Sequence, residues 1–464
     1  MGVPECLGCQ ALLKRIAEQE ARILALEAQV RDLHDKLKPT TPPRPITPTS
    51  PPPAKTPTGK KRGAQPGHPP KMKALLPPER VTTVVPYIPT TCRKCQKPLS
   101  AEPSPSDAAP TRHQRAELPP VLVEITEYQG HSRTCSCCGT VTTAAIPADI
   151  RAVHVGPRLT AMMAFMAGAQ GDSQRTIETF VETVIGVPIA LGSVANLQQE
   201  MSDALAIAYQ QARQAVAEAD VKHLDETGWK EQGKKRWLWT GAIASAVVFL
   251  IHPRRNLTAL KDLLGQTMSG ILCSDRWCVY DHWPLDRRQV CWAHLKRNWE
   301  KLVERGGASK AIGEKCLKIK DRVFELWHSF RGGGMTRKEM DERMATLSDE
   351  LSSILHEGES HADGRLARFC GRILDVYPAL WLFVTEEGVE PTNNHGERVQ
   401  RRAVLWRRRS FGCQSASGCR FVERILTTVE TLRLQKRNVL EFLQASVVAH
   451  RAGSAPPRLV PTAG

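Results

Sequence analysis

Residues 221–253 read VKHLDETGWKEQGKKRWLWTGAIASAVVFLIHP, and this stretch decides which fold the chain is expected to adopt. Two strand-like runs, VKHLDETGWK and RWLWTGAIAS, flank the turn-like EQGKK, and AVVFLIHP is a third run. NLTALKDLLGQ (256–266) then has helical periodicity, and GILCSD (270–275) is a short fourth apolar run. We therefore predict three antiparallel strands, a helix and one further strand, in that order.

This order of elements opens the ribonuclease H-like (RNase H-like) α/β fold. In that fold Asp225 would lie in the first strand and Asp275 at the end of the fourth, and these strands are neighbours in the sheet. Neighbouring strands lie about 4.8 Å apart, so we expect the two carboxylates within a few ångströms of each other.

Such a pair of acids is typical of a site for two Mg²⁺ ions, because hard cations take several oxygen ligands and paired ions lie roughly 3.5–4 Å apart. One ion would activate the attacking water or hydroxyl, and the other would neutralise charge on the leaving 3′ oxygen. Two carboxylates hold two ions poorly, so a third acid is expected from later in the chain.

Glu397 is the candidate third acid, within EPTNNHGERVQRRAVLWRRRSFG (390–412). The bases that follow it are Arg398, Arg401, Arg402, Arg407, Arg408 and Arg409. Asn393 or Asn394 could cap a helix here, and Glu397 follows Asn394 by three residues, so a capping box is one interpretation. The other is that Glu397 holds a metal ion while the arginines clamp phosphates, which the presence of the two earlier acids favours. The competing acids are Asp281, Asp286, Glu226 and Glu390.

The composition of the chain points to a polyanionic partner. It has 464 residues, a formal net charge of +16 and a pI near 9.4, and nucleic acid is the commonest partner of such a protein, although the charge could also serve solubility alone. No signal-peptide pattern follows Met1 and no apolar run is as long as a membrane span, so a cytoplasmic location is expected. Fourteen cysteines in such a chain favour metal binding over disulfides.

Two Cys-x-x-Cys pairs predict a structural Zn²⁺ in a domain over 76–150. TCRKC supplies Cys92 and Cys95, and RTCSCCG supplies Cys135 and Cys138 with Cys137 between them. Strands in ELPPVLVEITEYQ (117–129) could fold the pairs together. Cys135 or Cys137 could be the ligand, and only the two-residue spacing to Cys138 favours Cys135.

The N-terminal region carries a heptad pattern over 9–37. One position holds Ile16, Ile23, Val30 and Leu37, and the other holds Leu12, Gln19, Leu26 and Leu33. This pattern favours a parallel coiled-coil dimerisation helix over 1–38, and the alternative is one amphipathic helix packed on its own domain.

The remaining segments follow from composition and periodicity. A proline-rich, basic linker covers 39–75, in which Lys60, Lys61 and Arg62 could follow a phosphate backbone or could be only its tail. Residues 151–218 are expected to be helical, as a helix-turn-helix DNA-binding region or as a plain bundle. The catalytic domain is expected over 219–412 with a helical insertion at about 300–385, and C-terminal helices are expected over 413–450.

Five motifs in succession resemble the insertion sequence 66 family of bacterial transposases, which belong to the DDE class. They are HLDETGWK (223–230), ILCSDRWCVYD (271–281), QVCWAHLKRNW (289–299), EPTNNHGERVQRR (390–402) and the terminal helix TTVETLRLQKRNVLEFL (427–443). Upstream, GAQPGH, the paired cysteines and AELPPVLVEITEY also match the layout of that family. The resemblance extends from about Lys60 to Leu443.

This resemblance implies that Asp225, Asp275 and Glu397 form a DDE triad that uses two Mg²⁺ (or Mn²⁺) ions. It implies an enzyme that cuts the ends of its element by hydrolysis and joins the freed 3′ hydroxyls to target DNA. The implied partners are the terminal repeats, target DNA, further copies of the chain in a homodimer or higher oligomer, and small accessory proteins of the element. The implied location is the bacterial cytoplasm, in association with the nucleoid.

Some points stay open at the level of sequence. His294 could order the site or contact phosphate, or Cys291 and Trp292 could be core and His294 a satisfied polar group. Arg276 and Trp277 stand where the family pattern has a small residue and a tyrosine, so Arg276 could pair with Asp275 or contact DNA. A catalytically inactive DNA-binding relative and an RNase H-like nuclease are alternative functions, but the presence of all three carboxylates disfavours the first.

Overall fold

The computed structural model describes residues 75–102, 104–105, 108–117 and 123–461, together with five helical residues between 19 and 29. The chain divides into two compact units, Met1–Glu117 and Leu118–Gly464, and each is described by itself. Apart from those five residues, the expected coiled coil lies outside the described residues, as do Lys60, Lys61 and Arg62. None of the helices in the described part of the chain combines the length and apolar character needed to cross a bilayer.

The cysteine-bearing segments contain little regular structure. In the first unit they have a 3-10 helix, η1 (Pro78–Arg80), and an isolated bridge between Thr91 and Pro98. In the second unit a short hairpin of β1 (Ser132–Thr134) and β2 (Val141–Thr143) surrounds the second cysteine pair. The expectation of strands within 117–129 is wrong for 123–129, which belong to no strand, because the ladder forms instead on either side of the cysteine turn.

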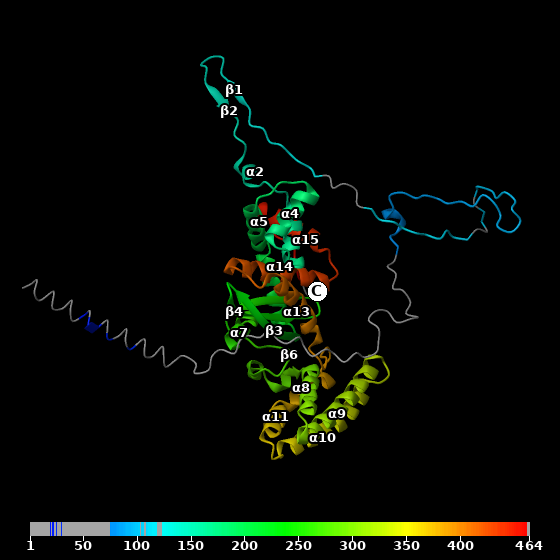
Figure 1. The fold of residues 1–464 in the computed structure, drawn as a ribbon, viewed down its shortest axis with the longest axis vertical. Helices are drawn as coiled ribbons and strands as arrows, with labels where there is room; N and C mark the ends of the chain where they lie inside the picture. The colour runs from blue at the N-terminus through cyan, green and yellow to red at the C-terminus, as the bar shows by residue number, and fades with distance from the viewer. Residues whose placement is uncertain are drawn as a thin grey trace, which may run out of the picture. The chain divides into compact units, whose positions relative to one another are not determined.

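A five-stranded mixed sheet forms the centre of the second unit (Figure 1). Its strands are β3 (Val221–Glu231), β4 (Lys234–Ala242), β5 (Val247–His252), β6 (Ile271–Ser274) and β7 (Arg288–Val290). The order across the sheet is β5-β4-β3-β6-β7; β3, β4 and β5 are antiparallel, whereas β6 and β7 run parallel to β3. The first four strands and the helix α7 (Leu257–Leu264) confirm the order expected from the sequence.

The turn between β3 and β4 fixes the register around Asp225. Gln232 and Gly233 both have positive φ, 49° and 73°, which two-residue hairpin turns require and which glycine adopts without strain. The register that follows pairs Asp225 with Thr240. A shift by one residue would turn the Asp225 side chain to the other face of the sheet.

Helix α14 (Ala416–Leu434) closes the β5 edge of the sheet. The side chains of Glu423, Thr427 and Thr431, each one helical turn apart, accept hydrogen bonds from backbone N–H groups of β5 at 2.5–3.0 Å. Edge strands otherwise present unpaired N–H groups on which another chain can pair. These three side chains therefore satisfy the edge of the sheet and exclude further strands from it.

One helical group comes from the middle and the end of the chain. It consists of α2 (Ala148–Ala152), α3 (Pro157–Phe165), α4 (Gln174–Phe180), α5 (Leu191–Ala204), α6 (Ala206–Glu218), α14 and α15 (Val439–Arg451), with π-helical turns η2 (Met166–Gln170) and η3 (Val181–Ile185). The expected helical character of 157–218 is confirmed, but the last helix expected there breaks at Leu205. The expected terminal helix over 427–443 is likewise two helices, the end of α14 and the start of α15.

A second helical group is inserted between β7 and the arginine-rich helix α13 (Asn394–Ser410). It consists of α8 (Trp292–Arg305), α9 (Gly307–Arg331), α10 (Arg337–Glu359), α11 (Gly364–Leu374), η6 (Tyr377–Leu380) and α12 (Leu382–Thr385). Short 3-10 turns, η4 (Cys278–His282) and η5 (Leu285–Arg287), lead from β6 to β7. Figure 1 shows α9 and α10 side by side, across the sheet from α4, α5 and α15.

Candidate active site

Asp225 and Asp275 come from adjacent strands. β3 and β6 pair in parallel, and His223 opposite Cys273 is their last partnered position. Asp225 and Asp275 each lie two residues further along the chain. The two acids therefore occupy equivalent positions on neighbouring strands, at the end where β6 stops and its chain turns away.

Asn393 positions the start of α13 against this end of the sheet. Its side-chain Nδ2 donates to the backbone oxygen of Leu224 at 2.7 Å, and its Oδ1 lies 2.9 Å from Nδ1 of His223. Its backbone N–H donates to Sγ of Cys291 at 3.1 Å. Because Asn393 is buried, these contacts tie the first turn of α13 to β3 and to the start of α8.

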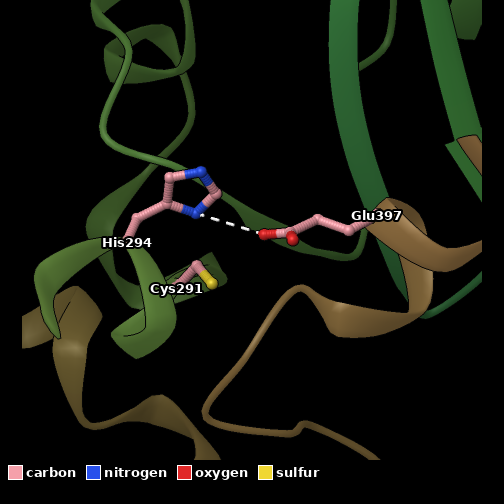
Figure 2. A group of neighbouring side chains, drawn as sticks. All are labelled: Cys291, His294 and Glu397. Carbon is pink, nitrogen blue, oxygen red and sulfur yellow. Dashed lines mark ion pairs between the residues drawn. The ribbon is translucent and has the colours of Figure 1, made fainter. Parts of the chain in front are cut away.

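The capping-box interpretation of Glu397 is wrong. Helix α13 begins at Asn394, and Asn393 at the N-cap position makes no side-chain capping hydrogen bond, because its amide is engaged with β3. Glu397 lies in the first turn, and its carboxylate extends away from the helix toward His294 (Figure 2).

Asp225 and Glu397 line the same cavity of about 630 Å³. Its lining consists of Asp225, Glu226, His294, Arg297, Asn394, Glu397, Arg398, Gln400, Arg401 and Val404. Strand β3, helix α8 and helix α13 thus contribute acids and arginines to one open, polar depression.

Asp225 is largely buried and has three other acids near it. Burial raises the pKa of Asp225 to about 8, and the neighbouring charges of Glu226, Asp275 and Glu397 add to the shift. With its amide oriented to satisfy both partners, Gln400 of α13 donates to Asp225 Oδ2 at 2.9 Å and accepts from the Glu226 N–H at 3.2 Å. A bound cation would relieve the repulsion among these carboxylates.

Asp275 lies near the cavity but is not among the residues that line it. Its Oδ1 accepts a hydrogen bond from the Trp277 N–H at 2.9 Å, which fixes the carboxylate after the end of β6. Arg276 points elsewhere: its guanidinium donates to the Arg372 backbone oxygen at 3.3 Å and lies over the Phe369 ring, so it connects this turn to α11. Arg276, which stands where the family pattern has a small residue, thus packs onto the helical insertion.

Glu397 meets two basic side chains of α8, His294, which Figure 2 shows, and Arg297. His294 Nδ1 lies 3.5 Å from Glu397 Oε1, and Arg297 donates to both carboxylate oxygens at 3.1 and 3.2 Å. Cys291, at the N-cap of α8, has its Sγ within 4.8 Å of the ligand atoms of both His294 and Glu397. Burial lowers the pKa of His294, and the charge of Arg297 lowers it further.

Three of the four residues in Cys291–His294 therefore differ in role. Trp292 belongs to the core, where its indole N–H donates to the Leu380 backbone oxygen at 2.7 Å. Cys291 is buried but its thiol faces the site, and His294 is not a satisfied polar group, since its buried Nδ1 has no hydrogen-bond partner among the described residues.

The competing acids occupy other environments. Glu226 is buried beside Asp225, where Arg255 and Tyr280 donate to its carboxylate. Asp281 pairs with Arg288 at 2.7 Å, Glu390 pairs with Arg331 at 3.6 Å, and Asp286 is exposed on the turn before β7. Of the four, only Glu226 lines the cavity, and its carboxylate already pairs with Arg255 and accepts a hydrogen bond from Tyr280.

Three of the arginines after Glu397 are held by the protein itself. Arg407 donates to Thr227 Oγ1 at 3.1 Å and so fastens α13 to β3. Arg409 pairs with Asp172 at 2.9 Å. Arg402 lies 3.5 Å from Glu430 on α14.

The other three arginines are exposed. Arg398, Arg401 and Arg408 have no ion-pair partner in the described part of the chain, and Arg398 and Arg401 line the cavity. Their guanidinium groups are free to bind an external anion beside Asp225 and Glu397.

The two cysteine pairs adopt the same turn, each within its own unit. The Cys92 N–H donates to the Lys97 oxygen and the Cys135 N–H donates to the Thr140 oxygen, both at 2.9 Å. The residue after each second cysteine, Gln96 or Gly139, has positive φ (57° and 69°). In these turns hydrogen bonds from neighbouring groups lower the pKa of Cys92 and Cys138. Cys135 therefore occupies the position equivalent to Cys92, and Cys137 does not.

Three residues of the site carried no separate signal in the sequence. Gln400 and Arg297 reach the carboxylates, and Asn393 reaches the Leu224 backbone oxygen, only through the folded arrangement of α8 and α13 against β3. The helical spacing of Glu397, Gln400 and Arg401, which lie on one face of α13, could have suggested Gln400.

Comparison with known proteins agrees with this geometry. Residues 152–420, more than half of the chain, match the model of a family described as "Transposase IS66 family". No curated protein matches the chain. The matched range contains the whole sheet, the helical insertion and α13, and with them Asp225, Asp275 and Glu397. The chain belongs to the IS66 family of transposases.

Proposed function

We propose that the protein is a DNA transposase that cleaves the ends of an insertion sequence and joins their 3′ hydroxyls to target DNA, with Asp225, Asp275 and Glu397 as its catalytic carboxylates. One observation carries the proposal: Asp225 and Glu397, far apart in the sequence, line one cavity, and Asp275 is close enough to raise the pKa of Asp225. The ligand atoms of these three acids do not all lie within 4.8 Å of one another, so the proposal requires the carboxylates to close on the ions when these bind.

The strand order supports an RNase H-like core. Three antiparallel strands are followed by two that run parallel to the first, and the acids lie on the central β3 and at the end of its parallel neighbour β6. The third acid comes from a helix after the insertion, which is the order that a DDE enzyme requires.

The donor set fits Mg²⁺ or Mn²⁺. Carboxylate oxygens are the ligands that these ions prefer. Burial, together with the charges of the neighbouring acids, raises the pKa of Asp225, and a cation would offset both. Two such ions, when bound, lower the pKa of the attacking water and neutralise charge on the leaving oxygen. Asp225, Asp275 and Glu397 would hold them, and Gln400 orients the Asp225 carboxylate.

The reaction also requires the DNA backbone to be held over the acids, and the exposed arginines supply this binding. Arg398 and Arg401 would bind the phosphates on either side of the scissile bond and fix the DNA backbone over the acids. The net charge of +16 supports DNA as the partner. The proposal includes a structural Zn²⁺ held by Cys92, Cys95, Cys135 and Cys138, a homodimeric or higher assembly, and accessory proteins of the element.

The test is to incubate the purified chain and Mg²⁺ with DNA that carries candidate element ends, and to map nicked and joined products. Cleavage at the element boundary followed by joining of the 3′ ends is the expected result. Nicks without joined products would identify a nuclease instead. Binding without either product, under conditions where Mn²⁺ also fails, would identify an inactive DNA-binding relative.

A further inference from the structure

We propose that Cys291, His294 and Glu397 form a binding site for Zn²⁺ that is distinct from the four-cysteine module and shares Glu397 with the catalytic carboxylates. A thiolate, an imidazole nitrogen and a carboxylate oxygen are the three ligand types that Zn²⁺ takes in proteins. In the described part of the chain, they are the one group of three such residues whose ligand atoms all lie within 4.8 Å of one another.

The spacing of the ligand atoms suits a small tetrahedral ion. Zn²⁺ binds nitrogen and oxygen at about 2.0–2.2 Å and sulfur at about 2.3 Å, so its ligand atoms stand roughly 3.3–3.8 Å from one another. His294 Nδ1 and Glu397 Oε1 are already 3.5 Å apart (Figure 2). Cys291 Sγ, within 4.8 Å of both, needs a movement of about 1 Å to complete the set.

Two of the ligands are oriented by contacts with the protein. His294 Nδ1 is buried and has no hydrogen-bond partner among the described residues, and it offers a lone pair to an ion once the ring proton lies on Nε2. Burial raises the pKa of the Cys291 thiol, and the Asn393 N–H, which donates to Cys291 Sγ at 3.1 Å, offsets part of that shift. On binding, the thiol proton of Cys291 passes to solvent and the ring proton of His294 is carried on Nε2.

Arg297 is the competitor of the ion. It donates to both oxygens of Glu397, and its Nη1 lies 3.3 Å from His294 Nε2, the nitrogen that must carry the proton when Nδ1 binds metal. The Arg297 side chain is 53 % exposed, so its ion pair with Glu397 is weak and the guanidinium can turn into solvent. Removal of Arg297 should therefore strengthen Zn²⁺ binding.

The consequence for catalysis rests on the proposed function. Mg²⁺ takes oxygen ligands and avoids thiolates, so it does not use Cys291. Zn²⁺ at this site would withdraw Glu397 from Asp225 and Asp275. The shared carboxylate therefore makes Zn²⁺ a competitive inhibitor of Mg²⁺-dependent cleavage.

The experiment is a Zn²⁺ titration of the full-length chain against a chelating indicator, with bound zinc counted by atomic emission. Wild type should bind one Zn²⁺ more than Cys291→Ser or His294→Gln. In each of these variants the loss of one ligand should weaken Zn²⁺ binding at the Cys291, His294 and Glu397 site by more than about 10-fold. Cys278→Ser, which changes an exposed thiol, is the matched control and should bind as wild type does. Equal stoichiometry and affinity in wild type, Cys291→Ser and His294→Gln would overturn the proposal.

Two further arms keep the result decisive. If the buried Cys291→Ser variant does not fold, the other two variants provide the test. Arg297→Ala should bind Zn²⁺ more tightly than wild type and His294→Gln more weakly. Unchanged affinity in both variants would overturn the proposed site. In cleavage assays Zn²⁺ should inhibit wild type, with relief by excess Mg²⁺, and should inhibit His294→Gln less at equal residual activity. Failure of wild type to cleave with Mg²⁺ alone would contradict the proposed function while the zinc count still tests the site.

Discussion

Asp225 and Asp275 stand at equivalent positions on two parallel neighbouring strands, each two residues beyond the last partnered position of β3 and β6. Glu397 lies in the first turn of α13 and lines the same cavity as Asp225. The helical insertion of α8 to α12 separates the second and third acids in sequence, while Asn393 returns the chain to the sheet. The site is therefore assembled by topology and not by local sequence.

The raised pKa of Asp225 predicts pH-dependent metal binding. In the folded protein this pKa is about 8, above its ordinary value of 3.8, so the fold favours the protonated carboxyl. Metal-free stability from this group is fully present below about pH 4 and is lost as pH rises to about 8. A divalent ion must displace the proton, so the affinity for Mn²⁺ should rise up to about tenfold per pH unit below pH 8.

Calorimetric titration with Mn²⁺ at several pH values measures this dependence. Asp225→Asn removes the titrating group, so whatever binding remains should lose most of its pH dependence. If the affinity of the wild-type protein for Mn²⁺ stays the same from about pH 6 to about pH 8, Asp225 is not protonated in the metal-free protein.

Arg297→Ala should strengthen Mn²⁺ binding. The Arg297 guanidinium neutralises Glu397 at 3.1 and 3.2 Å, and an incoming ion has to compete with it. Because exposed ion pairs contribute about 0–1 kcal/mol, the gain in affinity should be no more than about fivefold. The control is Lys296→Ala on the same helix, whose partner Glu300 lies 3.6 Å away and outside the cavity. Weaker binding in Arg297→Ala would show that Arg297 supports the ion instead of opposing it.

Thr427→Val and Thr431→Val should destabilise the protein. Each hydroxyl accepts the N–H of an edge-strand residue of β5 at 3.0 Å, and valine would leave that buried N–H without an acceptor. The expected cost is about 1–3 kcal/mol for each substitution, read from urea unfolding followed by tryptophan fluorescence. Thr428→Val is the matched control, since that hydroxyl bonds back to Arg424 O of its own helix. Equal effects at all three positions would contradict a specific role at the sheet edge.

Cys135→Ser should abolish zinc binding by the cysteine module, whereas Cys137→Ser should not. The turn around Cys135 has the same hydrogen bond and the same positive-φ residue as the turn around Cys92, and Cys137 has no counterpart in it. Bound zinc per chain, counted before and after exposure to a chelator, distinguishes the two variants. Loss of zinc from Cys137→Ser with retention in Cys135→Ser would reverse the ligand assignment.

The sheet was predictable because its pattern is local. VKHLDETGWK, RWLWTGAIAS and AVVFLIHP are short strand-like runs, and the turn-like EQGKK separates the first two. β7 was not predicted, because it has three residues and includes Arg288, whose burial depends on Asp281. The break at Leu205 was also missed, since this leucine continues the apolar pattern and only tertiary packing interrupts the helix.

The sequence pointed to the three candidate acids but not to the groups that contact them. Asp225, Asp275 and Glu397 stand out by motif, whereas the contact between Glu397 and α8 joins residues about a hundred positions apart. Local spacing left open whether Asn393 or Asn394 caps the helix that carries Glu397. In the structure the side-chain amide of Asn393 donates to the Leu224 backbone oxygen, a partner that no local pattern reveals.

The measurement that bears most directly on the triad is single-turnover cleavage of an element-end duplex with Mg²⁺ by three carboxamide variants. Asp225→Asn, Asp275→Asn and Glu397→Gln should each slow cleavage by about a thousandfold or more, since a lost metal ligand removes several kcal/mol of transition-state stabilisation, while DNA binding is retained. Glu390→Gln, which alters an exposed acid paired with Arg331, should cut at the wild-type rate. Wild-type cleavage by any one of the three variants would contradict a shared metal site.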